Sequence, residues 1–242
     1  MHTKKLFIVH GDKGGIGKSL FATAFTEFLL SRFGQACVVE GDAKIPDVAK
    51  RFGDSSEVTG LLTNLARSDK AEEATVTLFE KLEALGDVAG MVVINTPGSA
   101  SDTLDKNAHL FVPVARDMGY AIHVAWMVAD DVEGINLSME SALCDQADHK
   151  IAVINAAKTS ATSGPWHRSD ARKAWLESDG QEGVMPVLTD RAMAILRETQ
   201  RRPLDLTTPE SGQSIVIRQV FKNWLKACAD GPCKILLGED KS

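Results

Sequence analysis

The feature that most constrains the fold is a glycine-rich stretch, HGDKGGIGKS, at positions 10–19. A short apolar run at residues 6–9 precedes it, and residues 19–33 follow with apolar positions at helical spacing until Gly34. A strand, a glycine-rich loop ending in Gly-Lys-Ser and a helix, in that order, are typical of a phosphate-binding loop. Glycines let the backbone turn its N–H groups toward an anion, and the start of a helix adds partial positive charge. The stretch therefore predicts an α/β protein that binds phosphate groups.

Each residue type in this loop has an expected role. Lys18 should reach the β- and γ-phosphates of a nucleotide, and the Ser19 hydroxyl should bind Mg²⁺. The usual pattern places four residues between its first glycine and the closing Gly-Lys pair, whereas five separate Gly11 from Gly17, so the first loop position is not a glycine. The alternative, a glycine-rich turn without a ligand, is disfavoured because strand, spacing and helix agree. The residues expected to cradle the phosphates are Gly14, Gly15, Ile16, Gly17, Lys18, Ser19 and Leu20.

The rest of the chain alternates short apolar runs with helical patterns. We expect strands at residues 36–40, 91–95, 120–128 and 150–155, and helices at residues 103–118, 135–144, 171–177, 191–201 and 215–229. This alternation predicts a mostly parallel sheet with helices on both faces, which is the three-layer αβα arrangement of P-loop NTPases. Because no linker or repeat is visible, residues 1–242 are expected to form a single domain, with residues 230–242 poorly ordered.

Composition narrows the classes of function. The net charge of −6 argues against a nucleic-acid binder unless the surface holds a local basic patch. The four cysteines show no metal-binding spacing and suit reduced thiols. The apolar run near the N-terminus is too short for a signal peptide, and no apolar stretch has the length of a membrane span. We therefore expect a cytoplasmic protein with no integral membrane segment.

The sequence KGGIGKS at positions 13–19 resembles the deviant Walker A motif of the ParA/MinD family of ATPases, and the resemblance covers about residues 4–203. It implies an ATPase that binds ATP or ADP with Mg²⁺ and forms an ATP-dependent homodimer. Lys13 would be the signature lysine, which in this family reaches across the dimer to the partner's nucleotide. A lysine supplied by the partner couples ATP binding to dimerisation, much as an arginine finger does.

Two further segments resemble the switch elements of the family. Glu-Gly-Asp at positions 40–42 stands where the family usually has Asp-x-Asp, which implies that Asp42 positions the attacking water and that Glu40 lies near the metal. The alternative for Asp42 is a helix cap. Asn-Thr-Pro-Gly at positions 95–98 places Asn95 where the family has the Walker B aspartate. An amide keeps a hydrogen bond but gives up a charge, so we expect weak Mg²⁺ binding and slow hydrolysis. The implied catalytic residues are Lys13, Lys18 and Asp42, and the implied metal site is Ser19, Glu40, Asp42 and Asn95.

The resemblance also implies a site for the base. Asn155 ends an expected strand, where an asparagine of the family hydrogen-bonds adenine, and its alternative role is in a turn. Residues 183–191, GVMPVLTDR, resemble the loop that closes over the base, which places Pro186 there. A guanine-specific site would have the pattern Asn-Lys-x-Asp, whereas residues 155–158 read Asn-Ala-Ala-Lys, and we therefore favour adenine.

Surface features leave the partner open. Basic residues gather at positions 191, 197, 201 and 202 and again at 168, 172 and 173. They would suit nonspecific DNA binding, but solvated helix faces are the more common explanation. The helix at 215–229 is expected to pack on the core rather than on a membrane, and His10 to be a structural residue at a strand end.

Three functions follow from this pattern. The first is a slow ATP-driven dimerisation switch for plasmid partition or conjugative transfer, acting on nonspecific DNA or through a DNA-binding adaptor protein. The second is a metabolic or maturation ATPase on the same scaffold, which the lack of paired cysteines makes less attractive. The third is a nucleotide-binding regulator with weakened catalysis, which Asn95 favours.

Overall fold

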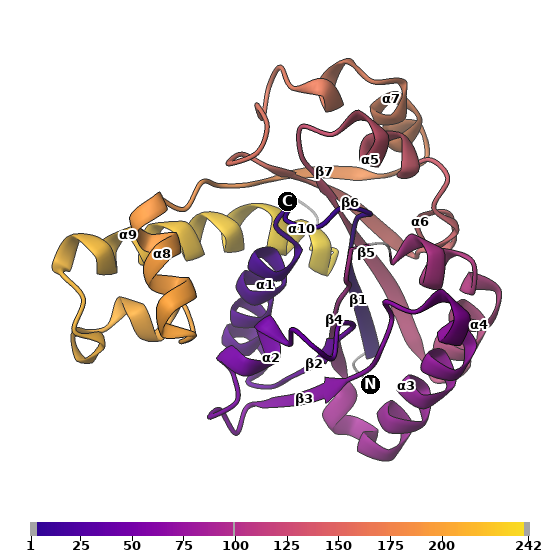
Figure 1. Ribbon diagram of the computed structural model, residues 1–242, viewed down its shortest axis with the longest axis horizontal. Coiled ribbons are helices and arrows are strands. Elements are labelled where there is room, and N and C mark those ends of the chain that lie inside the picture. The colour runs from indigo at the N-terminus through magenta and orange to yellow at the C-terminus, as the bar shows by residue number, and fades with distance from the viewer. Residues whose placement is uncertain (1–3, 99, 240–242) are drawn as a thin grey trace.

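The computed structural model describes residues 4–98 and 100–239, which form a sheet with helices packed on both faces (Figure 1). The sheet has seven strands in the order β3-β2-β4-β1-β5-β6-β7, and all neighbours are parallel. The strands are β1 (Lys4–His10), β2 (Ala36–Glu40), β3 (Val58–Leu62), β4 (Met91–Asn95), β5 (Tyr120–Val128), β6 (His149–Asn155) and β7 (Gln181–Met185). The expected parallel sheet is confirmed. Because all strands run the same way, their carboxyl ends share one edge, where such sheets bind ligands.

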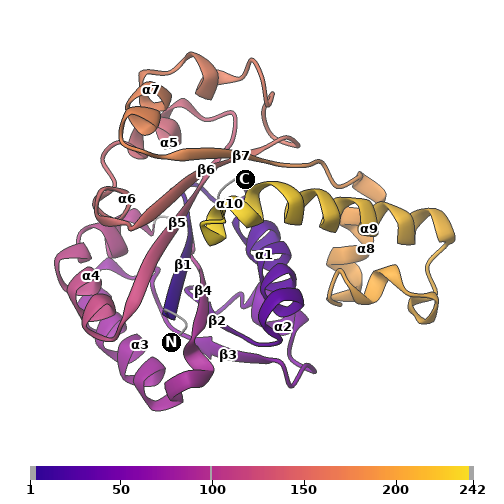
Figure 2. The ribbon, with the colours of Figure 1, turned by 180° about the vertical axis from the view of Figure 1, so that it is seen from behind.

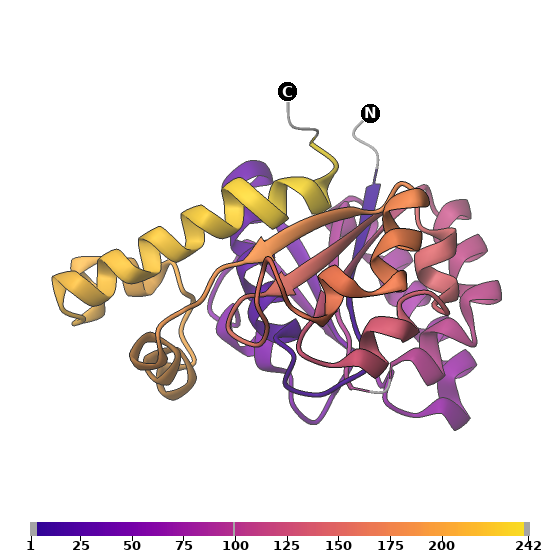
Figure 3. The ribbon, with the colours of Figure 1, turned by 90° about the horizontal axis from the view of Figure 1, so that it is seen from above.

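The helices divide between the two faces of the sheet (Figures 1 and 2). One face carries α1 (Lys18–Phe33), α2 (Asp47–Arg51), α8 (Asp190–Thr199), α9 (Ile215–Cys228) and α10 (Lys234–Leu237). The opposite face carries α3 (Ala71–Leu85), α4 (Ala108–Asp117), α5 (Val132–Leu137), α6 (Ala142–Gln146) and α7 (Asp170–Glu177). Seen from above, α9 extends well beyond the sheet with α8 beside it (Figure 3).

Strand β1 shows why the sheet is buried on both faces. Its residues Phe7 and Val9 belong to the core under α1, whereas Leu6 and Ile8 belong to the core under α3 and α4. All four side chains are fully buried. Successive side chains of a strand point to opposite faces, so a strand covered on both sides must be apolar throughout. The apolar run therefore marks the centre of the sheet, with β4 and β5 as its neighbours.

Several elements differ from the sequence-based expectation. Strand β3 and helix α3 were not expected. The helix expected at residues 135–144 is divided into α5, which ends at Leu137, and α6, which begins at Ala142 after Ser141 caps it through a hydrogen bond from the Cys144 amide. The helix expected from residue 103 begins at Ala108, after a single π-helical turn at Ser101–Asp105. Pro113 lies inside α4, and the helix continues past it to Asp117.

The C-terminal segment also differs from the expectation of poor order. Helix α9 continues through a kinked turn, Ala229–Cys233, into α10. Leu236 and Cys233 are fully buried, and the Lys5 ammonium donates a hydrogen bond of 2.6 Å to the carbonyl oxygen of Leu237. Residues 229–239 are thus ordered and contribute Cys233, Ile235, Leu236 and Leu237 to the core, whereas residues 240–242 lie outside the described residues. Within residues 4–98 and 100–239, no helix combines the length and apolar character that a membrane span requires.

Candidate functional site

A cleft of about 1030 Å³ lies at the carboxyl edge of the sheet. Its walls come from the loop after β1, the segments after β2 and β4, the turn after β6 and the loop between β7 and α8. Most of the site residues predicted from the sequence line this cleft: Gly14, Gly15, Gly17, Lys18, Ser19, Leu20, Asp42, Asn95, Asn155 and Pro186. Ile16 is buried below the loop, and Lys13 and Glu40 lie beside the cleft rather than in its lining. A cavity of this volume accommodates a nucleotide.

The glycine-rich loop takes a conformation that needs glycine. Gly17 has a φ of 109° and lies directly before the first residue of α1. A Cβ atom at Gly17 would lie 2.5 Å from Nδ2 of Asn155. Gly15 also has a positive φ, 75°, and open space around it. The loop therefore wraps around the start of α1, as a phosphate-binding loop does, and its glycines supply both the left-handed backbone and the close approach.

Lys18 is folded against the loop itself. Its ammonium group donates hydrogen bonds to the carbonyl oxygens of Gly11, at 2.9 Å, and Lys13, at 2.6 Å. The side chain is buried, and this burial lowers the pKa of Lys18 to about 8, an effect that the nearby Asp12 carboxylate only partly offsets. A buried ammonium without an anionic partner is costly, so the site favours a ligand that brings negative charge to Lys18.

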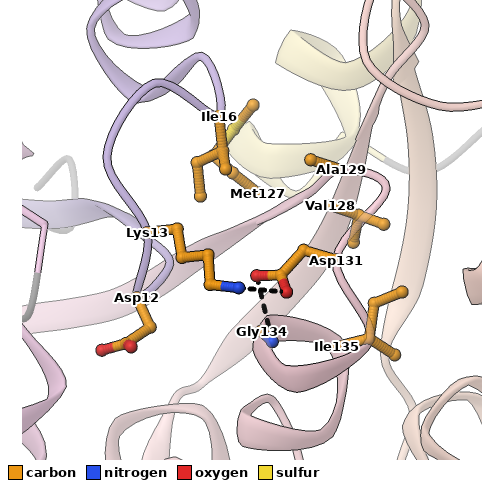
Figure 4. Close-up of a pocket in the computed structure, with 9 residues that line it drawn as sticks. All are labelled: Asp12, Lys13, Ile16, Met127, Val128, Ala129, Asp131, Gly134 and Ile135. Atoms are coloured by element: carbon orange, nitrogen blue, oxygen red, sulfur yellow. Dashed lines mark hydrogen bonds and ion pairs between the residues drawn. The ribbon is translucent and has the colours of Figure 1, made fainter.

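Lys13 points away from the loop toward the segment after β5, as Figure 4 shows. Its ammonium lies 2.5 Å from Oδ1 of Asp131 and 3.6 Å from Oε2 of Glu133. The hydrogen bond from Lys13 to Asp131 raises the pKa of Lys13, and nearly half of the lysine side chain is exposed. Asp131 also caps α5 by accepting a hydrogen bond from the Gly134 amide. The first lysine of the motif is therefore on the surface, paired with acids of its own chain.

Ser19, Asn95 and Glu40 form one hydrogen-bonded group. Nδ2 of Asn95 donates to Ser19 Oγ at 3.2 Å and to Glu40 Oε2 at 2.8 Å. The other oxygen of Glu40 accepts hydrogen bonds from the amides of Val48, at 2.5 Å, and Ala49, at 2.8 Å, at the start of α2. Burial raises the pKa of Glu40, although these three hydrogen bonds oppose the rise. Glu40 thus holds α2 in place, a role that its neighbours in sequence do not reveal.

Asp42 stands apart from this group. Its Oδ1 accepts a hydrogen bond of 2.9 Å from the backbone amide of Lys44, and the residue lines the cleft. It does not cap α2, since that helix begins at Asp47 and its start is held by Glu40. The structure therefore brings Ser19, Glu40 and Asn95 together, while Asp42 lines the same cleft and is hydrogen-bonded within its own turn.

One buried atom of this group has the chemistry that a hydrated Mg²⁺ ion would use. Oδ1 of Asn95 is buried and has no hydrogen-bond partner among the described residues. A buried amide oxygen without a donor is unfavourable, and a metal-bound water would satisfy it. The Ser19 hydroxyl lies on the other side of the same amide. The residues thus fit a magnesium ion carried with a nucleotide, because Mg²⁺ keeps several waters and takes few protein ligands.

Asn155 and Pro186 lie on the side of the cleft expected to hold the base. Nδ2 of Asn155 donates to the carbonyl oxygen of Ile16 at 2.8 Å, and its Oδ1 accepts from the Ala157 amide at 3.0 Å. Asn155 therefore supports the phosphate loop and forms a turn, and its contact with a base stays a prediction. The Pro186 carbonyl oxygen accepts a hydrogen bond from Trp224, which fixes this loop to α9.

Some of the basic residues considered for DNA binding serve the fold. The Arg202 side chain is only 14% exposed and pairs with Oε2 of Glu27 at 2.8 Å. Arg172 pairs in the same way with Glu182, also at 2.8 Å. Another contact was missed by sequence reasoning: His10 pairs with Asp105, 95 positions later, through a 3.0 Å hydrogen bond. No local pattern signals that pair, because the topology alone brings the two residues together.

Comparison with known proteins gives one sequence relative and several structures of the same fold. The chain is 36% identical over 197 residues to "Protein MobD" of Acidithiobacillus ferrooxidans, covering 78% of this chain and 80% of that protein. A McdA–ATP complex from Cyanothece matches all of this chain with a TM-score of 0.53 at 12% identity, over 99% of its own length. MinD from Pyrococcus horikoshii, complexed with Mg-ADP, matches 92% of this chain and 94% of its own with a TM-score of 0.52 at 14% identity. No protein-family model matches the chain. The expected three-layer P-loop fold is confirmed.

Proposed function

The chain belongs to the same family as Protein MobD, and we propose that it is an ATP-binding switch that dimerises with ATP and hydrolyses it slowly. The observation that carries this proposal is the phosphate loop, in which the buried Lys18 ammonium donates hydrogen bonds to the carbonyl oxygens of Gly11 and Lys13. A triphosphate would supply the missing negative charge. Relatives of the same fold support the choice of ligand, since MinD was solved with Mg-ADP and McdA with ATP.

The residues divide into clear roles toward the nucleotide. The backbone amides of residues 14–20 and the Lys18 ammonium would hold the phosphates. Ser19 and Asn95 would hold the hydrated magnesium ion, which neutralises phosphate charge when bound. Asp42 would orient the attacking water, and Asn155 and Pro186 would border the adenine. The expected adenine specificity rests on the resemblance and on the place of these two residues in the cleft.

Slow turnover is proposed from the distribution of charge. Asn95 brings no negative charge to the metal, and the carboxylate of Glu40 is already engaged by the amides of α2 and by Asn95. Among the described residues, no group of three or more His, Cys, Asp or Glu side chains is arranged to bind a metal ion. Mg²⁺ would therefore depend mainly on the phosphates for its charge partners, which weakens its binding.

Dimerisation is proposed from Lys13. Its ammonium is at the surface and is paired with Asp131 and Glu133 of its own chain. To reach a partner's nucleotide it must leave these acids, so the ion pair would keep the lysine in its own subunit until ATP is bound on the facing copy. The cargo of such a switch would be DNA or a protein in plasmid partition or conjugative transfer, reached directly or through an adaptor.

A second candidate is a regulator that binds ATP and dimerises without turnover. The Asn95 amide at the Walker B position favours it, because the neighbouring Glu40 carboxylate is already engaged by Asn95 and by the amides at the start of α2. The two candidates agree on nucleotide binding and differ only in hydrolysis.

The test is nucleotide binding, oligomeric state and phosphate release for the wild type, Lys18→Ala and Lys13→Ala. We expect ATP with magnesium to convert the wild type to a dimer, Lys18→Ala to lose nucleotide, and Lys13→Ala to bind ATP as a monomer. Measurable phosphate release favours the switch, and dimers without release favour the regulator. Absence of ATP binding by the wild type at millimolar magnesium would refute both.

A further inference from the structure

His10 is the last residue of β1 and directly precedes the phosphate loop. The side chain is fully buried, with its ring edge-on to Trp126 at 4.9 Å between centroids. Nε2 lies 3.0 Å from Oδ2 of Asp105, at the end of the turn that follows the Asn-Thr-Pro-Gly segment. The pair thus connects the start of the phosphate loop to the far end of a switch segment.

The hydrogen bond has a defined direction. Oδ1 of Asp105 accepts hydrogen bonds from Ser141 Oγ at 2.7 Å and from the Leu143 amide at 3.0 Å. Burial opposes ionisation of Asp105, but these contacts and His10 hold its pKa below the usual range. An ionised carboxylate only accepts, so Nε2 of His10 carries the proton and donates it. Asp105 is therefore fixed by α6 on one side and by His10 on the other.

The other end of the switch segment is fixed by the neighbouring residue of the same strand. The carbonyl oxygen of Val9 accepts hydrogen bonds from the Thr96 amide, at 3.2 Å, and from Thr96 Oγ1, at 2.8 Å. Two consecutive residues of β1 therefore hold Thr96 and Asp105. Between these anchors, Gly98 passes so close to the loop that a Cβ atom on it would lie 3.2 Å from the Gly14 amide nitrogen. The switch segment is thus set against the phosphate loop from both of its ends.

We propose that His10 is a positioning residue for ATP hydrolysis, which holds residues 96–98 and 100–105 in register with the phosphate loop. The inference rests on the proposed function, since it assigns a role within that site. His10 does not line the cleft and touches no expected ligand. It acts through Asp105, so its loss should change the placement of the segment and leave the phosphate-binding residues in place.

Packing alone would not require a histidine here. Nδ1 of His10 is buried and has no hydrogen-bond partner among the described residues, which is a cost that an apolar ring would avoid. A phenylalanine would keep the edge-on contact with Trp126 and remove the hydrogen bond to Asp105. A residue kept only for packing would therefore tolerate His10→Phe, whereas a positioning residue would not.

The test compares His10→Phe with His10→Gln, whose amide nitrogen can still donate to Asp105, and with the control His123→Phe. His123 is another buried histidine of the sheet, hydrogen-bonded to the Leu236 carbonyl oxygen at 2.7 Å and remote from the switch segment in the contacts it makes. Each variant is measured for ATP affinity, kcat and amide hydrogen exchange of a peptide covering residues 96–105, the exchange being recorded without nucleotide.

His10→Phe should lower kcat about tenfold, as loss of one hydrogen bond to a charged group does, with ATP affinity changed less than about twofold. It should also speed exchange in residues 96–105. His10→Gln should recover most of the wild-type kcat and most of the protection of the 96–105 peptide. His123→Phe should leave hydrogen exchange in that peptide at the wild-type rate. Exchange in His10→Phe that equals the wild type, or that rises no more than in His123→Phe, would overturn the inference. The exchange measurement needs no nucleotide, so the two failures can be told apart: a wild type that ignores ATP would refute the proposed function and with it any role in hydrolysis, whereas unchanged exchange or unchanged kcat in His10→Phe would overturn the role of His10 alone.

Discussion

Asn95 and Glu40 face each other as direct partners on neighbouring strands, and the amide of one donates a 2.8 Å hydrogen bond to the carboxylate of the other. The pair carries one negative charge, and the charge lies on β2 rather than on β4. The amides at the start of α2 and the Ser19 hydroxyl complete its surroundings. Changes at these two side chains should therefore affect the stability of the protein and, under the proposed function, its affinity for magnesium.

Asn95→Asp should destabilise the nucleotide-free protein by about 2 kcal/mol, because a hydrogen bond to a buried carboxylate is replaced by repulsion between two carboxylates. The loss should shrink on acidification, since one shared proton restores a hydrogen bond between the two groups. Magnesium with ATP should also recover part of it. Urea unfolding at neutral and mildly acidic pH, with and without nucleotide, measures these effects.

The double variant Glu40→Gln/Asn95→Asp is the matched control. The new amide at position 40 can accept from Val48 and Ala49 and donate to position 95, so the hydrogen bonds are kept with the charge moved to β4. We expect near wild-type stability and tighter magnesium binding. If Asn95→Asp alone changes neither stability nor magnesium affinity, the account of this pair is wrong.

Lys18 should give the nucleotide-free protein a distinct dependence on pH. Burial lowers its pKa from 10.5 to about 8. The unfolded chain therefore binds more protons than the folded one above about pH 8, and stability rises with pH in that range. Relative to Lys18→Met, the wild type should gain about 2 kcal/mol of unfolding free energy between about pH 7.5 and pH 9.5. The measurement is urea unfolding of both proteins at the two pH values. An equal change in unfolding free energy for the two proteins would contradict a Lys18 ammonium that is buried with a lowered pKa.

The contact between Lys13 and Asp131 should oppose dimerisation. Asp131→Asn weakens the hold on Lys13, so ATP-dependent dimers should form at a protein concentration about two- to fivefold lower, as expected for a surface ion pair. Glu133→Gln, which removes the more distant and more exposed acid, should have a smaller effect. Sedimentation across a concentration series with ATP provides the measurement. Unchanged dimerisation in Asp131→Asn, together with dimer formation by Lys13→Ala, would exclude a role of Lys13 between subunits.

Leu236→Ala should destabilise the protein by about 3 kcal/mol, because the leucine is fully buried and its removal leaves a cavity beneath α10. Leu204→Ala, at a position where the side chain is 48% exposed, is the control and should cost less than about 1 kcal/mol. Denaturant unfolding of both variants measures the difference. Equal effects would show that α10 contributes little to the core.

The sequence predicts the elements that obey simple periodicity. The strands β2, β4 and β5 have the expected bounds, since a strand buried on both faces is largely apolar, here with Glu40, Asn95 and His123 as the polar exceptions. The sequence pattern did not predict strand β3. This strand lies at the sheet edge, contains Gly60, and has exposed and half-buried positions where a central strand has buried ones. Strands that are buried on both faces can thus be predicted from their apolar residues, whereas a partly exposed edge strand cannot.

The residues of the candidate site also divide into those that local sequence spacing predicts and those that it does not. Local spacing identified the loop from Gly14 to Ser19, because its function depends on consecutive backbone groups. The partners of Glu40 and His10 could not be predicted, since they depend on which strands are neighbours and where each strand ends. The C-terminal segment differed for a related reason: its carbonyl groups are held by Lys5 and His123, residues far away in the sequence.

That last arrangement also shapes how the chain must fold. The hydrogen bond from Lys5 to Leu237 closes a separation of 232 positions, and β1, the central strand, is flanked by strands from distant parts of the sequence. Contacts of such long range cannot form until the ends of the intervening chain have been brought together. This loses conformational entropy early in folding, before the contacts can stabilise the protein. We therefore expect slow refolding, with the α10 side of the sheet among the last regions to become protected.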